Sequence, residues 1–276
     1  MRFFLANLLA AALLAALLPA TAVAQAVVST GQSFVTVRLL PGIGHEDGAR
    51  TAGLRLSLAE GWKTYWRSPG EAGIPPHLDW SASTNLAGAE LLWPRPELFQ
   101  SFGLRTVGYS EQVVLPVRVT PKDPALPVNL VLTGDFGVCR DICVIERVEL
   151  NATLEPGMRD VGGSQIRRAL NEVPVPAAEV GVRHVACRFT GQGEELRLEA
   201  VVQFDDPLLA AEVVVEGTEK LWLRRSTSQI QDGALHVSAE AELPSGMSWI
   251  DRSAVRLTVL ADRFAADIQG CKAPEG

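Results

Sequence analysis

The sequence predicts an all-β protein built from two immunoglobulin-like antiparallel β-sandwich domains, joined by a short linker that contains one helical turn or a short helix. Three observations support this prediction. Apolar residues alternate with polar ones in many short segments, which is the period of a half-buried strand. The alternation stops in one stretch rich in Pro and Gly and then resumes. The length of 276 residues exceeds the usual size of a single domain.

The N-terminal segment, residues 1–24, is expected to be a secretory signal peptide. Arg2 precedes an apolar run from Phe3 to Leu18, and Ala22-Val23-Ala24 is a cleavage site of the A-x-A type. The alternative is a retained membrane anchor, because the apolar run approaches the length of a membrane span. We expect the cleaved signal, and therefore an exported protein.

The first predicted domain covers residues 25–155. Large aromatic side chains of a sandwich usually fill its core, so Trp62, Tyr65 and Trp66 are expected there. The Gly and Pro residues between positions 69 and 76 predict a turn-rich loop. The alternating apolar residues that predict its strands are Phe34 to Leu39; Leu54, Leu56 and Leu58; Val113 to Val119; Val128, Leu130 and Leu132; and Val148, Leu150 and Leu154.

The linker is predicted at residues 156–180, with a short helix from Gln165 to Glu172, because Ile166 and Leu170 are four residues apart. The second domain, residues 181–276, again shows a period of two. Its strands are predicted at Val185, Cys187 and Phe189; Leu196, Leu198, Ala200 and Val202; Val213 and Val215; Leu221 and Leu223; Leu235 and Val237; and Val255, Leu257 and Val259.

Composition excludes several classes of function. The formal net charge is −7 and no long basic tract occurs, whereas nucleic-acid binding needs a basic face, so we expect no nucleic-acid partner. No G-x-S-x-G, H-E-x-x-H or paired-carboxylate signature is present, so the sequence does not suggest a hydrolase. No cofactor is predicted.

The four cysteines separate into two pairs by position. Cys187 and Cys271 lie near the two ends of the second domain, and a bridge between them would be structural. Cys139 and Cys143 enclose only three residues, so a disulfide between them would stabilise the fold little by closing a loop. This favours a redox function for Cys139 and Cys143, although a small structural clip and other connectivities stay open.

A metal site is the other alternative for Cys139 and Cys143. Two thiolates could hold Cu(I), but the four histidines are scattered through the chain and show no ligand spacing. We therefore predict no metal site. The C-x-x-C motif of thioredoxins is also absent, so this chain is not expected to have a thioredoxin fold.

Four motifs in order resemble one family. They are Gly61-Trp62-Lys63-Thr64-Tyr65-Trp66-Arg67-Ser68-Pro69-Gly70-Glu71-Ala72-Gly73, Trp93-Pro94-Arg95-Pro96, Gly108-Tyr109 with Val113, Leu115, Pro116 and Val117, and Val138-Cys139-Arg140-Asp141-Ile142-Cys143. Together they resemble the N-terminal periplasmic domain of the thiol:disulfide interchange protein DsbD, in the branch typified by the suppressor-of-copper-sensitivity protein B. The resemblance covers residues 27–154 most strongly.

The resemblance implies a periplasmic thiol-disulfide carrier, a protein-disulfide reductase-like oxidoreductase whose redox couple is Cys139 and Cys143. In that family an acidic residue and an aromatic residue on a cap loop shield the couple, and Glu97 and Phe99 are the candidates here. Family members continue into a membrane domain and a thioredoxin-like domain, whereas this chain ends at Gly276. We therefore expect a separate membrane-embedded protein to donate electrons and periplasmic thioredoxin-like proteins to receive them.

Two hypotheses of function follow. In the first, Cys139 and Cys143 cycle between dithiol and disulfide and pass electrons to client proteins. In the second, the protein is a non-catalytic periplasmic binding module for Cu(I) or a protein partner, and both disulfides are structural.

Overall fold

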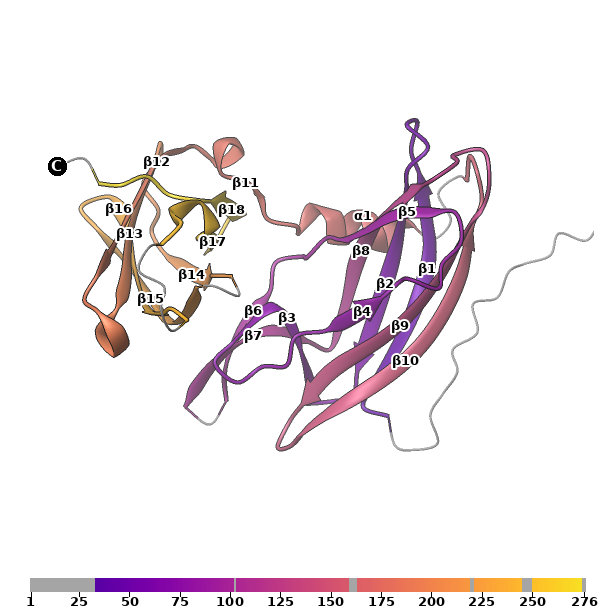
Figure 1. The fold of residues 1–276 in the computed structure, drawn as a ribbon, viewed down its shortest axis with the longest axis horizontal. Helices are drawn as coiled ribbons and strands as arrows, with labels where there is room; N and C mark the ends of the chain where they lie inside the picture. Colours follow the sequence, from indigo (N-terminus) through magenta and orange to yellow (C-terminus); the bar gives the residue numbers. More distant parts are fainter. Residues whose placement is uncertain (1–32, 102, 159–162, 219–220, 245–249, 275–276) are drawn as a thin grey trace, which may run out of the picture.

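The computed structural model describes residues 33–101, 103–158, 163–218, 221–244 and 250–274. The predicted signal peptide, residues 1–24, lies outside the described residues. The strands form four sheets that group into two pairs, which lie side by side (Figure 1). Each pair of sheets surrounds its own cluster of buried apolar residues. The predicted all-β class is therefore confirmed.

The first pair of sheets contains the residues before the linker. One sheet has the order β1-β2-β8-β5, with the bounds Val35–Gly44, Arg50–Leu58, Gln112–Pro121 and Leu86–Leu91. The other has the order β10-β9-β3-β7-β6, with the bounds Cys143–Leu154, Val128–Cys139, Lys63–Gly70, Leu104–Ser110 and Glu97–Ser101; β4, His77–Asp79, pairs with β9. We call the second of these the cysteine sheet, because it carries Cys139 and Cys143.

The second pair of sheets contains the rest of the chain. One sheet has the order β11-β18-β17-β14, with the bounds Val175–Pro176, Ala265–Gln269, Arg256–Ala261 and Ala211–Glu216. The other has the order β12-β13-β16-β15, with the bounds Val182–Thr190, Arg197–Phe204, Ala234–Glu242 and Trp222–Gln231. Short 3₁₀ helices span Ala177–Val180, Gly193–Glu195 and Arg252–Ala254. Among these strands β11 and β18 pair in parallel, which differs from the predicted antiparallel pattern.

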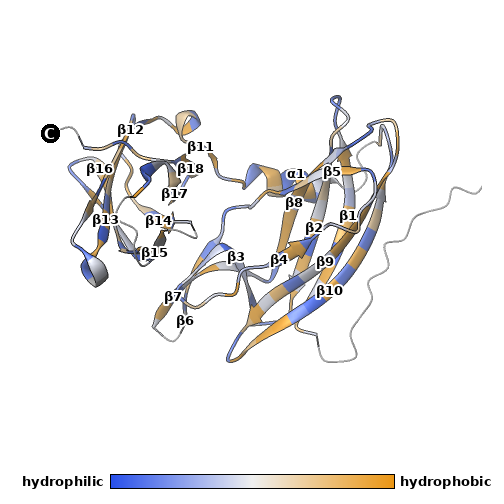
Figure 2. Cartoon of the chain, viewed as in Figure 1, coloured by the Kyte–Doolittle hydropathy of each residue, from blue (hydrophilic) through white to orange (hydrophobic). Residues whose placement is uncertain are grey.

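Every segment predicted as a strand contains residues of an observed strand, because one face of each lies against a core. The hydropathy alternates visibly along β10 (Figure 2). The strands that the alternation did not predict include β3, β6 and β7. In β3 and β7, glycines, a proline and consecutive buried residues disturb the period of two.

The predicted short helix is α1, Gly163–Asn171. It packs on the outer face of the first sheet, where the buried Ile166 lies against Gly53 and Val114. A Cβ at Gly53 would lie 2.9 Å from Cγ1 of Ile166, so the absence of a side chain at this position makes room for the helix. The predicted linker therefore includes a helix that belongs to the packing of the first half. Among the described residues no helix combines the length and apolar composition that a membrane crossing needs.

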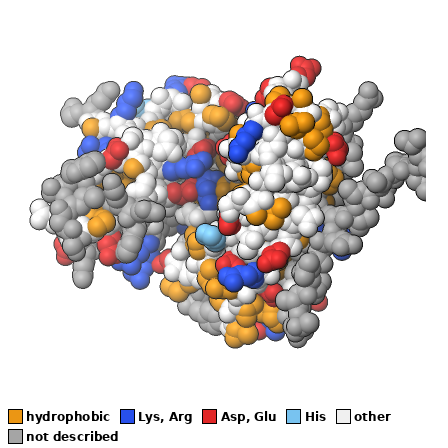
Figure 3. Space-filling view, turned by 45° about the vertical axis from the view of Figure 1, so that its right-hand side comes forward, with side chains coloured by type: hydrophobic (Ala, Val, Ile, Leu, Met, Phe, Trp, Pro, Cys, Tyr) orange, Lys and Arg blue, Asp and Glu red, His pale blue; other side chains and the backbone are white. Residues whose placement is uncertain are grey.

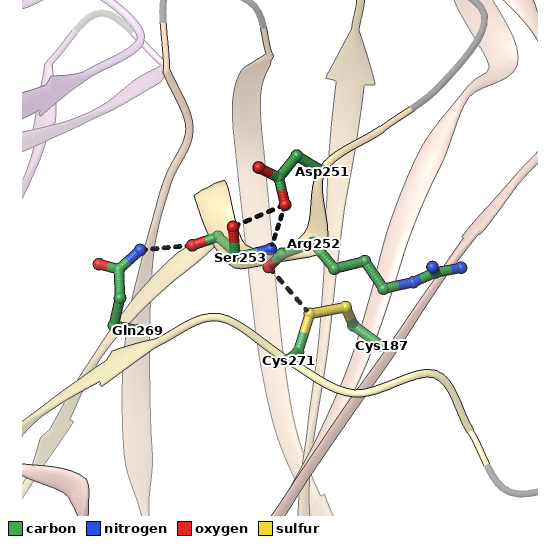
Figure 4. Close-up of a disulfide and its surroundings, with 6 residues drawn as sticks. All are labelled: Cys187, Asp251, Arg252, Ser253, Gln269 and Cys271. Atoms are coloured by element: carbon green, nitrogen blue, oxygen red, sulfur yellow. Dashed lines mark hydrogen bonds between the residues drawn. A yellow bond between two sulfur atoms is a disulfide. The ribbon is translucent and has the colours of Figure 1, made fainter.

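Cys187 and Cys271 form a disulfide with their Cα atoms 5.6 Å apart. It joins β12 to the segment after β18, and the backbone N–H of Cys187 donates to the Lys272 carbonyl at 2.8 Å. Close to the sulfurs, Asp251 accepts hydrogen bonds from the backbone and hydroxyl of Ser253, which orders the turn that Cys271 contacts (Figure 4). The bridge thus connects two ends of the second half of the chain.

Polar and charged side chains form part of the contact between the two halves. The guanidinium of Arg67 on β3 makes two hydrogen bonds to the carboxylate of Glu216 on β14, at 2.8 and 2.9 Å, and contacts the Thr258 hydroxyl at 3.2 Å. Arg95 donates to the carbonyls of Ala261 and Phe264 from the same side. Figure 3 shows basic and acidic side chains next to one another where the halves meet.

Candidate functional site

Cys139 and Cys143 close the hairpin that β9 and β10 form. Cys139 is the last residue of β9, Cys143 is the first of β10, and the two are paired in the register of the sheet. They form a disulfide with Cα atoms 4.1 Å apart. Only Arg140, Asp141 and Ile142 lie between them, and the Arg140 N–H donates to the Ile142 carbonyl at 3.0 Å, which tightens the turn. The disulfide therefore lies at the tip of a long hairpin.

The two sulfur-bearing residues differ in exposure. Cys139 is 7% exposed, whereas Cys143 is exposed to solvent. Burial alternates along β9 from Val128 to Asp135, but the four residues from Phe136 to Cys139 are all buried. Because successive side chains of a strand point to opposite faces, this end of β9 must be covered on both sides.

The inner face of this region belongs to the core between the two sheets. Trp66, Phe136 and Val138 are buried there, together with Trp62. The expectation that Trp62 and Trp66 fill the core is therefore confirmed. Tyr65 is also buried, but the alternation of side chains along β3 directs it to the opposite face of the sheet from Trp66.

The outer face of the cysteine sheet carries the surroundings of the disulfide. Residues directly opposite one another in an antiparallel pair share a face, and Lys63 pairs with both Cys139 and Ser110. Two residues further along β3, Tyr65 lies on the same face, and its hydroxyl is 4.0 Å from Sγ of Cys143. Tyr65 therefore brings a polar group close to a sulfur of this pair.

A loop between β3 and β4, residues 71–76, covers this outer face. Ile74 lies over Gly137, where an added Cβ would come within 2.8 Å of the Ile74 carbonyl oxygen. Gly73 lies against the ring of Tyr65, with an added Cβ 2.6 Å from its Cδ1. The predicted turn-rich loop is therefore a cover over the residues next to Cys139, and both glycines permit its close approach. We call it the 71–76 loop.

The polar and charged side chains near the cysteines contact other groups of the protein. Arg140 and Asp141 form an ion pair at 2.9 Å in the hairpin turn, so their opposite effects on a thiolate largely cancel. The ammonium of Lys63 lies 4.2 Å from the ring centroid of Phe99, a cation–π contact. Burial raises the pKa of the Tyr65 hydroxyl, so this group stays protonated and able to donate a hydrogen bond near Cys143.

The structure brings the predicted cap residues to the same face but not to the sulfurs. Glu97 and Phe99 lie on β6, and β3 and β7 separate that strand from β9. The Glu97 carboxylate accepts a hydrogen bond from the Ser110 hydroxyl at 2.9 Å, and the ring of Phe99 makes the cation–π contact with Lys63. Their shielding role stays a prediction.

Sequence analysis did not identify Lys63, Tyr65, Ile74 or Gly137 as neighbours of the disulfide. One signal was available, because Lys63 and Tyr65 are two residues apart and must share a face that Thr64 and Trp66 do not. Which strand lies beside them is not encoded in that spacing. Within the described ranges, His, Cys, Asp and Glu side chains form no group of three or more that could hold a metal ion.

Comparisons with known proteins agree with this architecture. Residues 35–155 match the model of the family "Thiol:disulfide interchange protein DsbD, N-terminal". The crystal structure of the N-terminal periplasmic domain of ScsB from Proteus mirabilis aligns with a TM-score of 0.71 and 21% sequence identity, covering 91% of this chain and 98% of that chain. This likeness shows a shared fold across both pairs of sheets. A comparison with curated protein sequences gives no match. The resemblance inferred from the four motifs is confirmed.

Proposed function

We propose that this protein, whose residues 35–155 match the N-terminal family of the thiol:disulfide interchange protein DsbD, carries electrons between other proteins through the Cys139–Cys143 pair. The observation that carries the proposal is the unequal exposure of the two cysteines at the hairpin tip. Thiol-disulfide exchange needs one sulfur that a partner can reach and a second that resolves the mixed disulfide. An exposed Cys143 beside a buried Cys139 supplies that arrangement.

In the reduced protein, the Cys143 thiolate attacks a sulfur of a client disulfide. The client S–S bond breaks, its other sulfur leaves with the electron pair and takes up a proton, and Cys143 is joined to the client. The Cys139 thiolate then attacks Sγ of Cys143, the mixed disulfide breaks, and the second client sulfur leaves and is protonated. The client gains two electrons and two protons, and the Cys139–Cys143 disulfide forms.

The surface next to Cys143 supports a protein as the reaction partner. Ile142 and Ile145 flank it and are 62% and 63% exposed. Ile145 shares the face of Cys143, because it is two residues further along β10. Two large apolar side chains beside a reactive sulfur give a partner protein apolar area to bury during exchange.

We propose a periplasmic location, a membrane-embedded electron donor and thioredoxin-like clients. The predicted signal peptide in residues 1–24 supports export, although it lies outside the described residues. The structural relative is itself described as a periplasmic domain. An oxidising compartment is where a protein with two disulfides is expected to work.

Single-cysteine variants test the proposal with a purified thioredoxin variant as the client, which keeps only its exposed active-site cysteine, activated as a mixed disulfide with thionitrobenzoate. The second active-site thiol of an intact thioredoxin would expel Cys143 and re-form the client disulfide. We expect Cys139→Ala, which leaves the exposed Cys143, to accumulate a mixed disulfide that resists dilution and is released by dithiothreitol. Cys143→Ala, which leaves the buried Cys139, is expected to trap at least about tenfold less, since exchange requires access to the sulfur. Mass spectrometry of alkylated peptides reports both products and shows whether Cys187 and Cys271 stay bonded.

Two results would contradict the proposal. One is a reduction potential for Cys139–Cys143 below about −300 mV, the range of structural disulfides. The other is the absence of any mixed disulfide with Cys139→Ala while circular dichroism shows that the variant is folded.

A further inference from the structure

The first residue of the 71–76 loop, Glu71, is bound by residues of both halves of the molecule. Glu71 follows β3, and its backbone N–H donates to the Arg105 carbonyl at 2.9 Å. Its carboxylate accepts the Arg105 N–H at 2.8 Å through one oxygen, and the guanidinium of Arg225 binds the other oxygen at 3.1 Å. Arg225 belongs to β15 in the second half of the chain. Glu71 thus links the loop over the disulfide to the second pair of sheets.

The backbone of β15 is distorted where it presents Arg225. The register of β15 against β16 shifts between Arg224 and Thr227, which marks a β-bulge, and Arg225 itself has a φ of 48°. This left-handed conformation is uncommon for a residue with a side chain. A bulge redirects a side chain out of the regular alternation, and here the redirected guanidinium meets Glu71 and Glu240.

Arg105 makes a second set of contacts between the two halves, next to the Glu71–Arg225 pair. The guanidinium of Arg105 donates to the Ser226 carbonyl at 2.7 Å and to the Glu212 carboxylate at 2.9 Å. Arg105 of the first half therefore contacts the second half, and Arg225 of the second half contacts the first. Glu71 binds both arginines.

At its far end the loop is held by the cysteine sheet. His77 begins β4 and pairs with Asp135 of β9, so residues 72–76 run between two fixed points. Within that span, Ile74 covers Gly137 and Gly73 contacts Tyr65. Gly137 precedes Cys139 by two residues and lies on the same face of β9. On the neighbouring strand β3, Tyr65 lies diagonally opposite Cys139. The position of the loop therefore bears on the burial of Cys139.

We propose that Arg225 is a positioning residue that holds the 71–76 loop through Glu71. In that position the loop keeps Cys139 covered and leaves Cys143 as the sulfur that a reagent reaches. The second half of the chain thereby selects which cysteine reacts. The consequence for electron transfer rests on the proposed function, whereas the selection between the two thiols does not.

The ratio of labelling at the two thiols tests this inference. The full-length protein is reduced with limiting dithiothreitol, so that Cys187 and Cys271 remain bonded, and is then pulsed with substoichiometric iodoacetamide. Peptide mass spectrometry gives the ratio of Cys139 to Cys143 labelling, in which Cys143 serves as an internal reference. We expect Arg225→Gln and Glu71→Gln each to raise this ratio about two- to fivefold, the size expected when an exposed ion pair is lost.

Several variants separate positioning from a general loss of structure. Arg224→Gln is the matched control, because Arg224 is also exposed and ion-paired but binds Glu240 and Glu242 of its own sheet. It is expected to leave the ratio unchanged, and Arg225→Lys is expected to restore part of the selectivity. The double variant Arg225→Gln/Glu71→Gln should not exceed the larger single effect, since both changes break the same pair. Raising the salt concentration should increase the ratio in the wild-type protein but not in Arg225→Gln.

Equal ratios in wild type, Arg225→Gln and Glu71→Gln, with all three folded by circular dichroism, would overturn the inference. An equal rise with Arg224→Gln would also overturn it, because the effect would then be general. If the wild-type protein exchanges with thioredoxin through Cys143 while the ratios stay equal, the inference alone fails. If the ratios change as expected while no exchange occurs, the positioning role stands and the proposed function fails.

Discussion

At the scale of single residues, the two tyrosines of the chain lie where ionisation is opposed. Burial raises the pKa of Tyr65 above its ordinary value. Burial also raises the pKa of Tyr109 well above that value, and the positive charge of Arg67 only partly offsets this effect. The Tyr109 hydroxyl donates to the Pro94 carbonyl at 2.8 Å, so ionisation would also break a hydrogen bond. One tyrosine lies beside the disulfide and the other lies in the core.

The raised pKa values predict how stability depends on pH in the alkaline range. The unfolded chain releases tyrosine protons near pH 10, about the ordinary pKa, whereas the folded protein still holds them. The stabilisation is therefore complete below that pH and is lost as the pH rises toward the folded pKa values. We expect tyrosinate absorbance to appear together with the loss of the circular dichroism signal. The control is the same titration in concentrated guanidinium chloride, where both tyrosines should titrate normally.

A tyrosinate signal with an ordinary pKa in a protein that is still folded would contradict this prediction. The variant Tyr109→Phe assigns the remaining signal to Tyr65, which is the group of interest for the disulfide. A protonated hydroxyl at that position can donate to a thiolate on Cys143.

At the scale of elements, α1 shows how the segment between the two halves is fixed. Ile166 is fully buried against the first sheet, and Ala169 packs beside it. The chain therefore leaves the first pair of sheets from a defined place rather than through a free spacer. Because the Arg95 N–H donates to the Glu172 carbonyl at 2.7 Å, the end of this helix is also tied to the segment before β6.

Truncation of Ile166 tests the packing of α1. We expect Ile166→Ala to lower the free energy of unfolding by about 2–4 kcal/mol, because it removes buried methylene groups and leaves a cavity over the sheet. Urea unfolding followed by circular dichroism measures the change. Gln165→Ala, at an exposed position of the same helix, is the control and should have little effect. Equal losses for the two variants would show that the helix is not packed as described.

At the scale of the whole molecule, an ion pair with little exposure joins the halves. The side chains of Arg67 and Glu216 are 17% and 10% exposed, and the guanidinium also lies 3.9 Å from the ring centroid of Trp66. Val214, Leu260 and Ala265 of the second half join the buried cluster of the first. The halves are therefore packed together as well as connected by the chain.

Removal of one partner should be more harmful than replacement of both. We expect Glu216→Gln to destabilise the protein by about 3 kcal/mol, because it leaves the Arg67 charge desolvated and unpaired. The double variant Arg67→Met/Glu216→Leu should recover a large part of that loss, since apolar side chains of similar volume can pack in the same place. Differential scanning calorimetry measures both. Glu199→Gln, which breaks the exposed pair with Arg188 inside one sheet, should shift the transition little.

Sequence patterns were a good guide to the regular strands and a poor guide to the strands around the site. Along β9, alternation marks residues 128–135, because one face there is solvated. It fails for residues 136–139, which are all buried; on the second face, Ile74 of the 71–76 loop covers Gly137. The same reason applies to β3, where Tyr65 and Trp66 are buried on opposite faces. Periodicity reports one-sided burial, so it loses its signal where a site is covered.

The residues of the candidate site likewise divide into those that could be identified from the sequence and those that could not. Cys139 and Cys143 could be found from sequence, because a hairpin disulfide is formed by residues that are near in the chain. Glu97 and Phe99 were chosen by analogy, and the structure gives them other partners, Ser110 and Lys63. Tyr65 and Arg225 could not be assigned, since their places depend on pairing between distant segments.

The sequence by itself determined the all-β class and the close cysteine pair, because each of these depends on composition or on local spacing. Tertiary structure alone decided that Cys139 is buried while Cys143 is exposed, that the 71–76 loop covers the sheet, and that Arg225 from the second half holds this loop. The physical reason is that burial and ion pairing are properties of neighbours in space. The chain brings those neighbours together only when its sheets pair and its two halves pack.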